Sequence, residues 1–182
     1  MIRKSSWLAL AAVLAIFAAA PPSKAASAAE IDTGVRATLD RFFMKVGGAR
    51  ELAQKSVGIL VFPSIVKAGF GLGGEYGEGA LLLKDRTVDY YNTVSASVGF
   101  QLGVQERAVI IMFMTESALS QFRRTHGWKV GVDGSVAIVT IGVGGSIDSN
   151  KITSPVIGFV LDPKGLMYNL TLEGSKISRI SR

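Results

Sequence analysis

Gly69, Gly71 and Gly74 have the spacing of a dinucleotide-binding loop. Such a loop binds a pyrophosphate only where it directly follows a strand and opens a helix, because the N–H groups of the helix N-terminus face the phosphates. Here Glu75 and Glu78 place negative charge where the phosphates would bind, and the next residues, ALLLKD, are typical of a strand. We therefore expect no nucleotide site and no other cofactor.

Glu75 and Glu78 could instead form a pair of catalytic carboxylates, as in glycoside hydrolases. In an extended segment a spacing of three sends the two side chains to opposite faces, and the surrounding glycines disfavour the helix that would bring them together. The simpler interpretation is that each carboxylate accepts local backbone N–H groups or pairs with Lys67 or Arg86. We expect no catalytic residues, and a hydrolase that uses these two glutamates stays an alternative.

The other reactive side chains do not indicate an enzyme either. The single histidine, His126, follows Arg123 and Arg124, and cationic neighbours disfavour both its protonation and a bound metal ion. The chain has no cysteine, which excludes disulfides, thiol nucleophiles and thiolate metal sites. We expect neither a metal site nor an enzymatic activity.

The N-terminal segment has the features of a secretory signal peptide. Arg3 and Lys4 precede an unbroken apolar run, Trp7 to Ala20, and two prolines and a stretch of small residues follow. A membrane span takes about 20 apolar residues, so this run is short for an uncleaved anchor, which is the alternative. We expect a signal peptide over residues 1–28, with cleavage after Ala28 and a second choice after Ala25.

The expected mature chain, residues 29–182, is long enough for a single domain with one sizeable core. Loss of the signal peptide removes three basic residues and lowers the formal net charge from +6 to +3. This charge is too small to indicate nucleic acid as a partner, but it is compatible with an anionic lipid surface. We expect a periplasmic or secreted protein, peripherally associated with a membrane.

Helical periodicity appears directly after the signal segment. Ile31 to Lys55 is expected to be helical, because Val35, Leu39, Phe42 and Val46 form one apolar stripe. Two consecutive glycines, at positions 47 and 48, should divide this region into a longer and a shorter helix.

The rest of the chain is dominated by strand patterns. Alternation of apolar with small or polar residues runs from Ser95 to Gln105, and a hairpin is expected around Asp85 and Arg86. Thr115 is placed to cap one short helix in the middle of the chain. We predict an α+β fold: a strongly curved antiparallel sheet, sandwich-like or barrel-like, with an N-terminal amphipathic helix and one short mid-chain helix.

The glycine-rich stretch fits this sheet better than it fits a phosphate loop. Its glycines would let backbones approach closely or bend sharply, with Phe70 and Tyr76 covering the result. The shape so created could be a shallow groove for acyl or headgroup atoms, lined by Phe70, Glu75, Tyr76 and Glu78.

Four blocks of sequence, taken in order, resemble the SYLF domain: VGILVFPSIVKAGFGLGGEYGEGALL, YYNTVSASVGFQLGVQ, IIMFMTESALSQF and GLMYNLTLEGSKI. The resemblance extends over roughly Val35 to Ile180. It implies a lipid-binding module with affinity for anionic phospholipids, for phosphoinositides in eukaryotic members, with actin association in fungal members and no enzymatic activity. An exported chain would meet envelope lipids such as phosphatidylglycerol or cardiolipin instead of phosphoinositides or actin.

Lipid binding of this kind needs an apolar surface and cations that meet headgroups. The candidate lipid-binding residues are Arg36, Arg41, Lys45, Arg50, Lys55 and Lys67. Equally, the apolar stripe of the first helix could pack on the sheet, with these charges merely solvated, and both arrangements can hold at once. A protein-interaction or scaffold role with an envelope protein, analogous to the actin binding of the family, is the alternative function.

Overall fold

The computed structural model describes residues 25–99, 105–139, 147, 153–162, 165–166, 172 and 174–182. The helices of this part are α2 (Ala28–Lys45), α3 (Ala49–Lys55) and α4 (Glu116–Arg124). The strands are β1 (Gly58–Leu83), β2 (Arg86–Gly99), β3 (Gln105–Phe113), β4 (Trp128–Lys129), β5 (Ala137–Ile138), β6 (Val156–Asp162), β7 (Gly165–Leu166) and β8 (Lys176–Ile180). Residues 1–24, most of the expected signal peptide, lie outside the described part.

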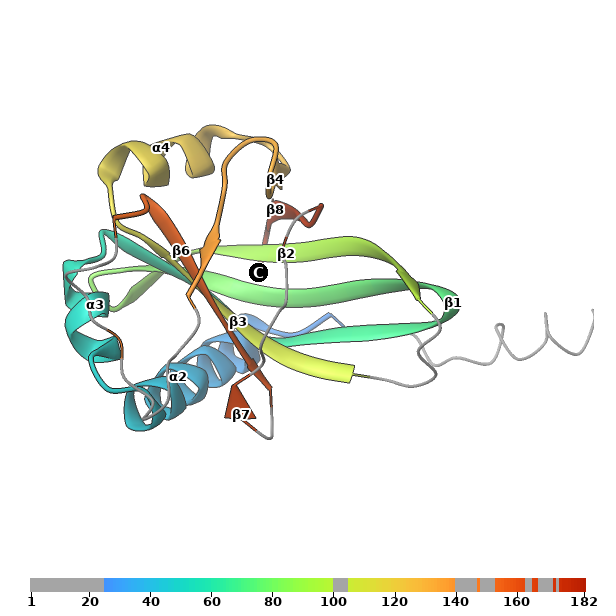
Figure 1. Cartoon of the computed structure of the whole chain (residues 1–182), viewed down its shortest axis with the longest axis horizontal. Coiled ribbons are helices and arrows are strands. Elements are labelled where there is room, and N and C mark those ends of the chain that lie inside the picture. The colour runs from blue at the N-terminus through green and yellow to red at the C-terminus, as the bar shows by residue number, and fades with distance from the viewer. Residues whose placement is uncertain are drawn as a thin grey trace, which may run out of the picture.

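All of these strands belong to one curled sheet, ordered β4-β8-β2-β1-β3-β6-β5, with β7 paired to β6 (Figure 1). The predicted α+β fold with a strongly curved sheet and an N-terminal helix is confirmed. The long ladders are antiparallel as predicted, but β5 pairs with β6 in parallel, so the sheet is mixed. A parallel contact needs a connection of a dozen or more residues, and the chain between β5 and β6 supplies it.

The longest strand, β1, folds back on itself. Its residues 58–67 pair with β3, whereas residues 71–83 pair with β2, and the two arms run side by side (Figure 1). A Cβ atom on Gly77 would lie 2.6 Å from the Ser64 carbonyl oxygen, and one on Gly79 would overlap the Val61 carbonyl oxygen. The prediction that these glycines permit close approach of two backbones is therefore confirmed.

The tight turn between β1 and β2 also has a local cause. Lys84 and Asp85 have φ of 49° and 63°, and the strands pair from Leu83 and Arg86 outwards. A two-residue hairpin with both central residues at positive φ matches the twist of its strands. The hairpin was predicted one residue further along the chain.

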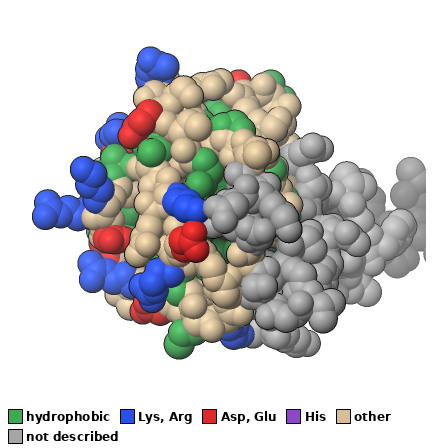
Figure 2. Space-filling view, turned by 60° about the vertical axis from the view of Figure 1, so that its left-hand side comes forward, with side chains coloured by type: hydrophobic (Ala, Val, Ile, Leu, Met, Phe, Trp, Pro, Cys, Tyr) green, Lys and Arg blue, Asp and Glu red, His purple; other side chains and the backbone are tan. Residues whose placement is uncertain are grey.

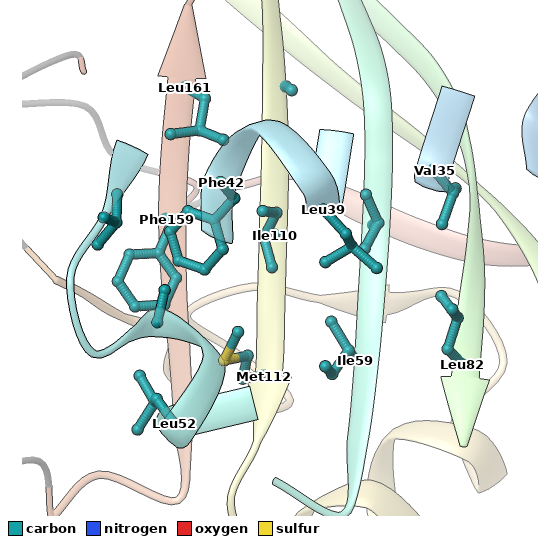
Figure 3. Close-up of a cluster of buried hydrophobic side chains, with 14 of the residues drawn as sticks. Val35, Leu39, Phe42, Leu52, Ile59, Leu82, Ile110, Met112, Phe159 and Leu161 are labelled. Carbon is teal, nitrogen blue, oxygen red and sulfur yellow. The ribbon is translucent and has the colours of Figure 1, made fainter. Parts of the chain in front are cut away.

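One face of the sheet is covered by α2 and α3. Val35, Leu39 and Phe42 of α2 point onto the strands and are buried, and Leu52 of α3 joins them (Figure 3). The Phe42 ring lies 4.8 Å from that of Phe159 on β6. The apolar stripe of the first helix thus belongs to the core of the protein.

The other face is covered by α4, which packs its Phe122 among aromatic rings. The Phe122 ring lies 4.9 Å from both Tyr91 and Phe113 and 5.4 Å from Trp128. Thr115 caps this helix as predicted, because its hydroxyl accepts the Ala118 N–H at 3.3 Å. Since both faces are covered, the strands in the middle of the sheet are buried on both sides.

Candidate functional site

A groove of about 670 Å³ lies between α2 and β1. Its wall on the side of α2 is formed by Ala25, Ala26, Glu30, Ile31, Gly34, Ala37, Thr38 and Arg41, and its wall on the side of β1 by Pro63, Ser64, Val66, Tyr76, Gly77 and Glu78. This volume is within the range of about 300–1,000 Å³ that pockets for small organic ligands occupy. More of the lining is apolar than polar.

Small residues on one flank of α2 shape this groove. Gly34 and Ala37 recur with the helical period, so they share that flank, and a Cβ atom on Gly34 would lie 3.0 Å from the ring of Pro63. The pairing of β1 with β3 shifts register between Phe62 and Ile65, where Pro63 has no N–H to donate. Helix and strand therefore touch at Gly34, and larger side chains at these positions would fill the groove.

Arg41 supplies the unusual polar group of the groove. Its Nε atom is buried, and no hydrogen-bond partner for it exists among the described residues. A buried N–H group without an acceptor costs about 1–3 kcal/mol, and more for a charged group. The planar guanidinium matches carboxylate and phosphate oxygens, so a ligand with an anionic oxygen would satisfy this atom.

Glu78 occupies the other end of the groove. It accepts hydrogen bonds from the Tyr76 hydroxyl at 2.6 Å and from the Ala26 N–H at 3.2 Å, and it pairs with Arg182. Burial works against ionisation of Glu78, but the hydrogen bonds from Tyr76 and Arg182 outweigh it and lower the pKa of this carboxyl. Burial, followed by the bond to Glu78, raises the pKa of Tyr76.

The two ends of the groove therefore differ in charge. Residues 27 and 41 are separated along the helix axis by about 20 Å at 1.5 Å per residue. At one end the negative charge of Glu78 is already neutralised by Arg182, whereas at the other the Arg41 Nε lacks an acceptor. A ligand with one anionic end and one extended apolar part would complement this arrangement.

Glu75 points away from the groove and is a structural residue. Its side chain is 10% exposed, pairs with Arg107 of β3 at 2.5 Å and with Lys67 at 3.9 Å, and accepts the Ser95 hydroxyl at 3.2 Å. Because Glu75 and Glu78 line different hollows, they form no catalytic pair, as the odd spacing predicted. Pairing of a glutamate with Lys67 is confirmed for Glu75.

The six predicted lipid-binding residues have different surroundings. Arg41 lines the groove, whereas Arg36 and Lys45 are exposed on α2. The Arg50 guanidinium lies 4.7 Å from the centre of the Phe43 ring, and Lys55 forms an ion pair with Glu51 at 2.9 Å. Lysines and arginines project around the helical end of the molecule, with acidic side chains between them (Figure 2). Their role in lipid binding stays a prediction.

Of the four residues predicted to line a groove, Tyr76 and Glu78 do so, and Glu75 does not. The side chain of Phe70 is outside the described part of the structure. From the wall on α2 the sequence had indicated only Arg41, as a lipid-binding residue; the rest of that wall was missed, although the recurrence of small residues at Gly34 and Ala37 was a signal for it.

Within the described residues, no group of histidine and acidic side chains could hold a metal ion. Among the helices of that same part, none has both the length and the apolar character to cross a membrane.

Comparison with known proteins provides one family match. The model of the family described as "Ysc84: Las17-binding protein actin regulator" matches residues 94–181, nearly half of the chain. The search of curated proteins found no match. The matched range runs from β2 to β8, so it contains most of three of the four resembling blocks, and the groove between α2 and β1 lies before it. Over residues 94–181 this match confirms the resemblance to the SYLF domain that the sequence blocks indicated.

Proposed function

We propose that this protein is exported and binds anionic phospholipid at the cell envelope without catalysing a reaction. The observation that carries the proposal is the buried Arg41 Nε, without an acceptor among the described residues, in the wall of a largely apolar groove. A protein keeps such a group at a cost in stability, and binding of an anionic ligand offers a reason for keeping it.

In the proposed complex an acyl chain lies along the apolar wall, and a phosphate oxygen accepts a hydrogen bond from Arg41. Val66 and Tyr76 line the groove and are 39% and 48% exposed, so they provide apolar contact at its rim. Phosphatidylglycerol and cardiolipin have the required chemistry and occur in bacterial envelopes.

Because the apolar stripe of α2 is buried, the protein would not associate with a membrane by inserting this stripe. Since Val35, Leu39 and Phe42 pack on the sheet, the helix does not offer them to a bilayer. Its exposed cations, Arg36 and Lys45, add general attraction to an anionic surface, at about 1 kcal/mol each near the membrane. Arg41 then selects the headgroup. Arg36 and Lys45 add attraction to the anionic surface but do not select a headgroup.

This difference allows a matched experiment with vesicles. Arg41→Gln and Arg36→Gln remove the same charge from the same helix, one inside the groove and one outside it. Binding to vesicles that contain phosphatidylglycerol or cardiolipin should fall about 10- to 100-fold for Arg41→Gln, the equivalent of a charged hydrogen bond of about 1.5–3 kcal/mol. Arg36→Gln should lose about fivefold or less. Co-sedimentation at two salt concentrations measures both.

A second variant tests the groove without changing any charge. Ala37 is exposed on its rim, so Ala37→Trp should fold normally while it fills the space for an acyl chain. We expect it to weaken vesicle binding as strongly as Arg41→Gln. Equal binding by wild type, Arg41→Gln and Ala37→Trp would refute the groove as the lipid site, and equal binding to phosphatidylcholine vesicles would refute the anionic preference.

The family match favours a second candidate function. The description of the family names a Las17-binding actin regulator, and the matched residues 94–181 would carry the corresponding protein contact. In an exported protein the partner would be an envelope protein. Binding to an envelope protein that survives Ala37→Trp, together with indifference to vesicles, would support this candidate over lipid binding.

A further inference from the structure

The backbone before α2 is held to the rest of the fold at Ala26. Its N–H donates to the Glu78 carboxylate at 3.2 Å across 52 residues of sequence, and its side chain packs against the core beneath α2. Ala26 is thus a fixed part of the domain.

The next residue, Ser27, begins the helix with a reciprocal cap. The Ser27 N–H donates to the Glu30 carboxylate at 2.7 Å, and the Glu30 N–H donates to the Ser27 hydroxyl at 3.3 Å. A capping box of this kind satisfies two N–H groups that the helix itself leaves without partners. Cleavage after Ala28 would remove Ala26, Ser27 and the cap together.

We propose that the signal peptide is cleaved between Ala25 and Ala26, and that the new α-ammonium group of Ala26 forms an ion pair with Glu78. Water adds to the carbonyl carbon of Ala25 and the peptide C–N bond breaks. Ala25 leaves as a carboxylate on the signal peptide, and the Ala26 nitrogen takes both protons of the water and becomes the ammonium group. The cut is that of a peptidase that recognises small residues, here Ser23 and Ala25.

Glu78 needs no additional position for the new ammonium group. A carboxylate has about four lone-pair positions, and the described residues occupy all four: Tyr76 and the Arg182 Nη2 donate to Oε1, and the Arg182 Nε and the present Ala26 N–H donate to Oε2. Cleavage replaces the neutral Ala26 donor by a cationic one at the same place, and this adds the attraction of opposite charges to a hydrogen bond that the carboxylate already accepts. Cleavage after Ala25 therefore keeps the contacts of Glu78 with Tyr76, Arg182 and Ala26, and it strengthens the contact with Ala26.

Mass spectrometry and N-terminal sequencing of the exported protein test the cleavage site. The full chain is expressed in a bacterium and recovered from the periplasm or the medium. We expect Ala26 as the first residue; a chain that begins at Ala29, or one that keeps its leader, would overturn the proposal. The outcome is independent of lipid binding, which is measured on vesicles.

The ion pair is tested on the processed protein by titrating its α-amino group with NMR. An ordinary α-amino group has a pKa of about 7.7–8.0, and pairing with Glu78 should raise this pKa. Each pKa unit of the rise lowers the fraction of free amine tenfold at neutral pH. Acylation of the amine should be slower by that factor in wild type than in Glu78→Gln, with the exposed Glu106→Gln as a matched control. An ordinary pKa in the wild type would overturn the ion pair, whether or not Glu78→Gln folds.

Discussion

Asp89 on β2 and Arg123 on α4 form an ion pair at 3.2 Å, although the side chain of Asp89 is only 2% exposed. Arg179 on β8 pairs with the other carboxylate oxygen. One buried acid therefore connects the central sheet to a helix on one side and to a strand near the edge on the other. Burial, and then the charge of Asp89, raises the pKa of the adjacent Tyr91.

Because two arginines share Asp89, their removal should not be additive. Arg123→Ala and Arg179→Ala should each cost about 1 kcal/mol, since both guanidinium groups are partly exposed and the other one remains. The double variant leaves a buried carboxylate without a charged partner and should cost about 3–5 kcal/mol. Urea unfolding of the four proteins measures the coupling free energy. A double variant that costs only the sum of the two single ones would contradict this account.

Removing the charge of Arg41 should not destabilise the free protein. Arg41→Met keeps the aliphatic part of the side chain and eliminates the buried Nε that lacks an acceptor, so thermal unfolding without lipid should show unchanged or higher stability, by up to about 1 kcal/mol. Arg107→Met is the contrasting variant, because it removes the partner of Glu75 and should destabilise. If Arg41→Met lost more than about 1 kcal/mol, Arg41 would be a structural residue.

Glu78 should make the stability of the fold depend on pH in the acid range. Its pKa in the folded state lies below the ordinary value of 4.5, so its contribution is complete above that value and is lost as the pH falls through the folded-state pKa. The free energy of unfolding of Glu78→Gln should therefore approach that of the wild type as the pH falls below 4.5. Chemical unfolding at a series of pH values tests this, with the exposed Glu106→Gln as the matched control.

Two glycines of β1 should respond differently to alanine. At Gly79 a Cβ atom would overlap the Val61 carbonyl oxygen, so Gly79→Ala forces the arms of β1 apart and should cost about 1–3 kcal/mol. At Gly74 the nearest atom, the Ser95 carbonyl oxygen, is 3.7 Å away, and Gly74→Ala should be neutral or stabilising by about 0.4–1 kcal/mol. Equal effects in thermal unfolding would show that the arms are not closely packed.

Local patterns were enough to predict the elements of this fold. The stripe through Val35, Leu39 and Phe42 indicated α2, and Thr115 marked the start of α4, because capping and periodicity act over a few residues. The fold-back of β1 was not predicted, since the glycines of this stretch indicated a bend or a close approach but not which strands lie beside each arm, and only the partners of each arm reveal it. The two arginines around Asp89 were also missed, because they lie 34 and 90 positions away.

The candidate site was predicted only in part for the same reason. Tyr76 and Glu78 were expected to line a groove, but its other wall depends on how α2 lies against Pro63. Arg41 could be recognised from the sequence as one cation among six. Arg41 differs from the other five because its Nε is buried without a described partner, and this difference arises only from packing.

The meeting of Ala26 and Arg182 on Glu78 makes this fold suited to circular permutation. The segment before α2 and the segment after β8 are both held by the Glu78 carboxylate. A linker of a few residues, each spanning at most about 3.6 Å, could therefore join them. New ends could then be opened in the two-residue turn at Lys84 and Asp85, where both side chains are exposed. Such a permuted chain would present the groove wall of α2 as an internal segment.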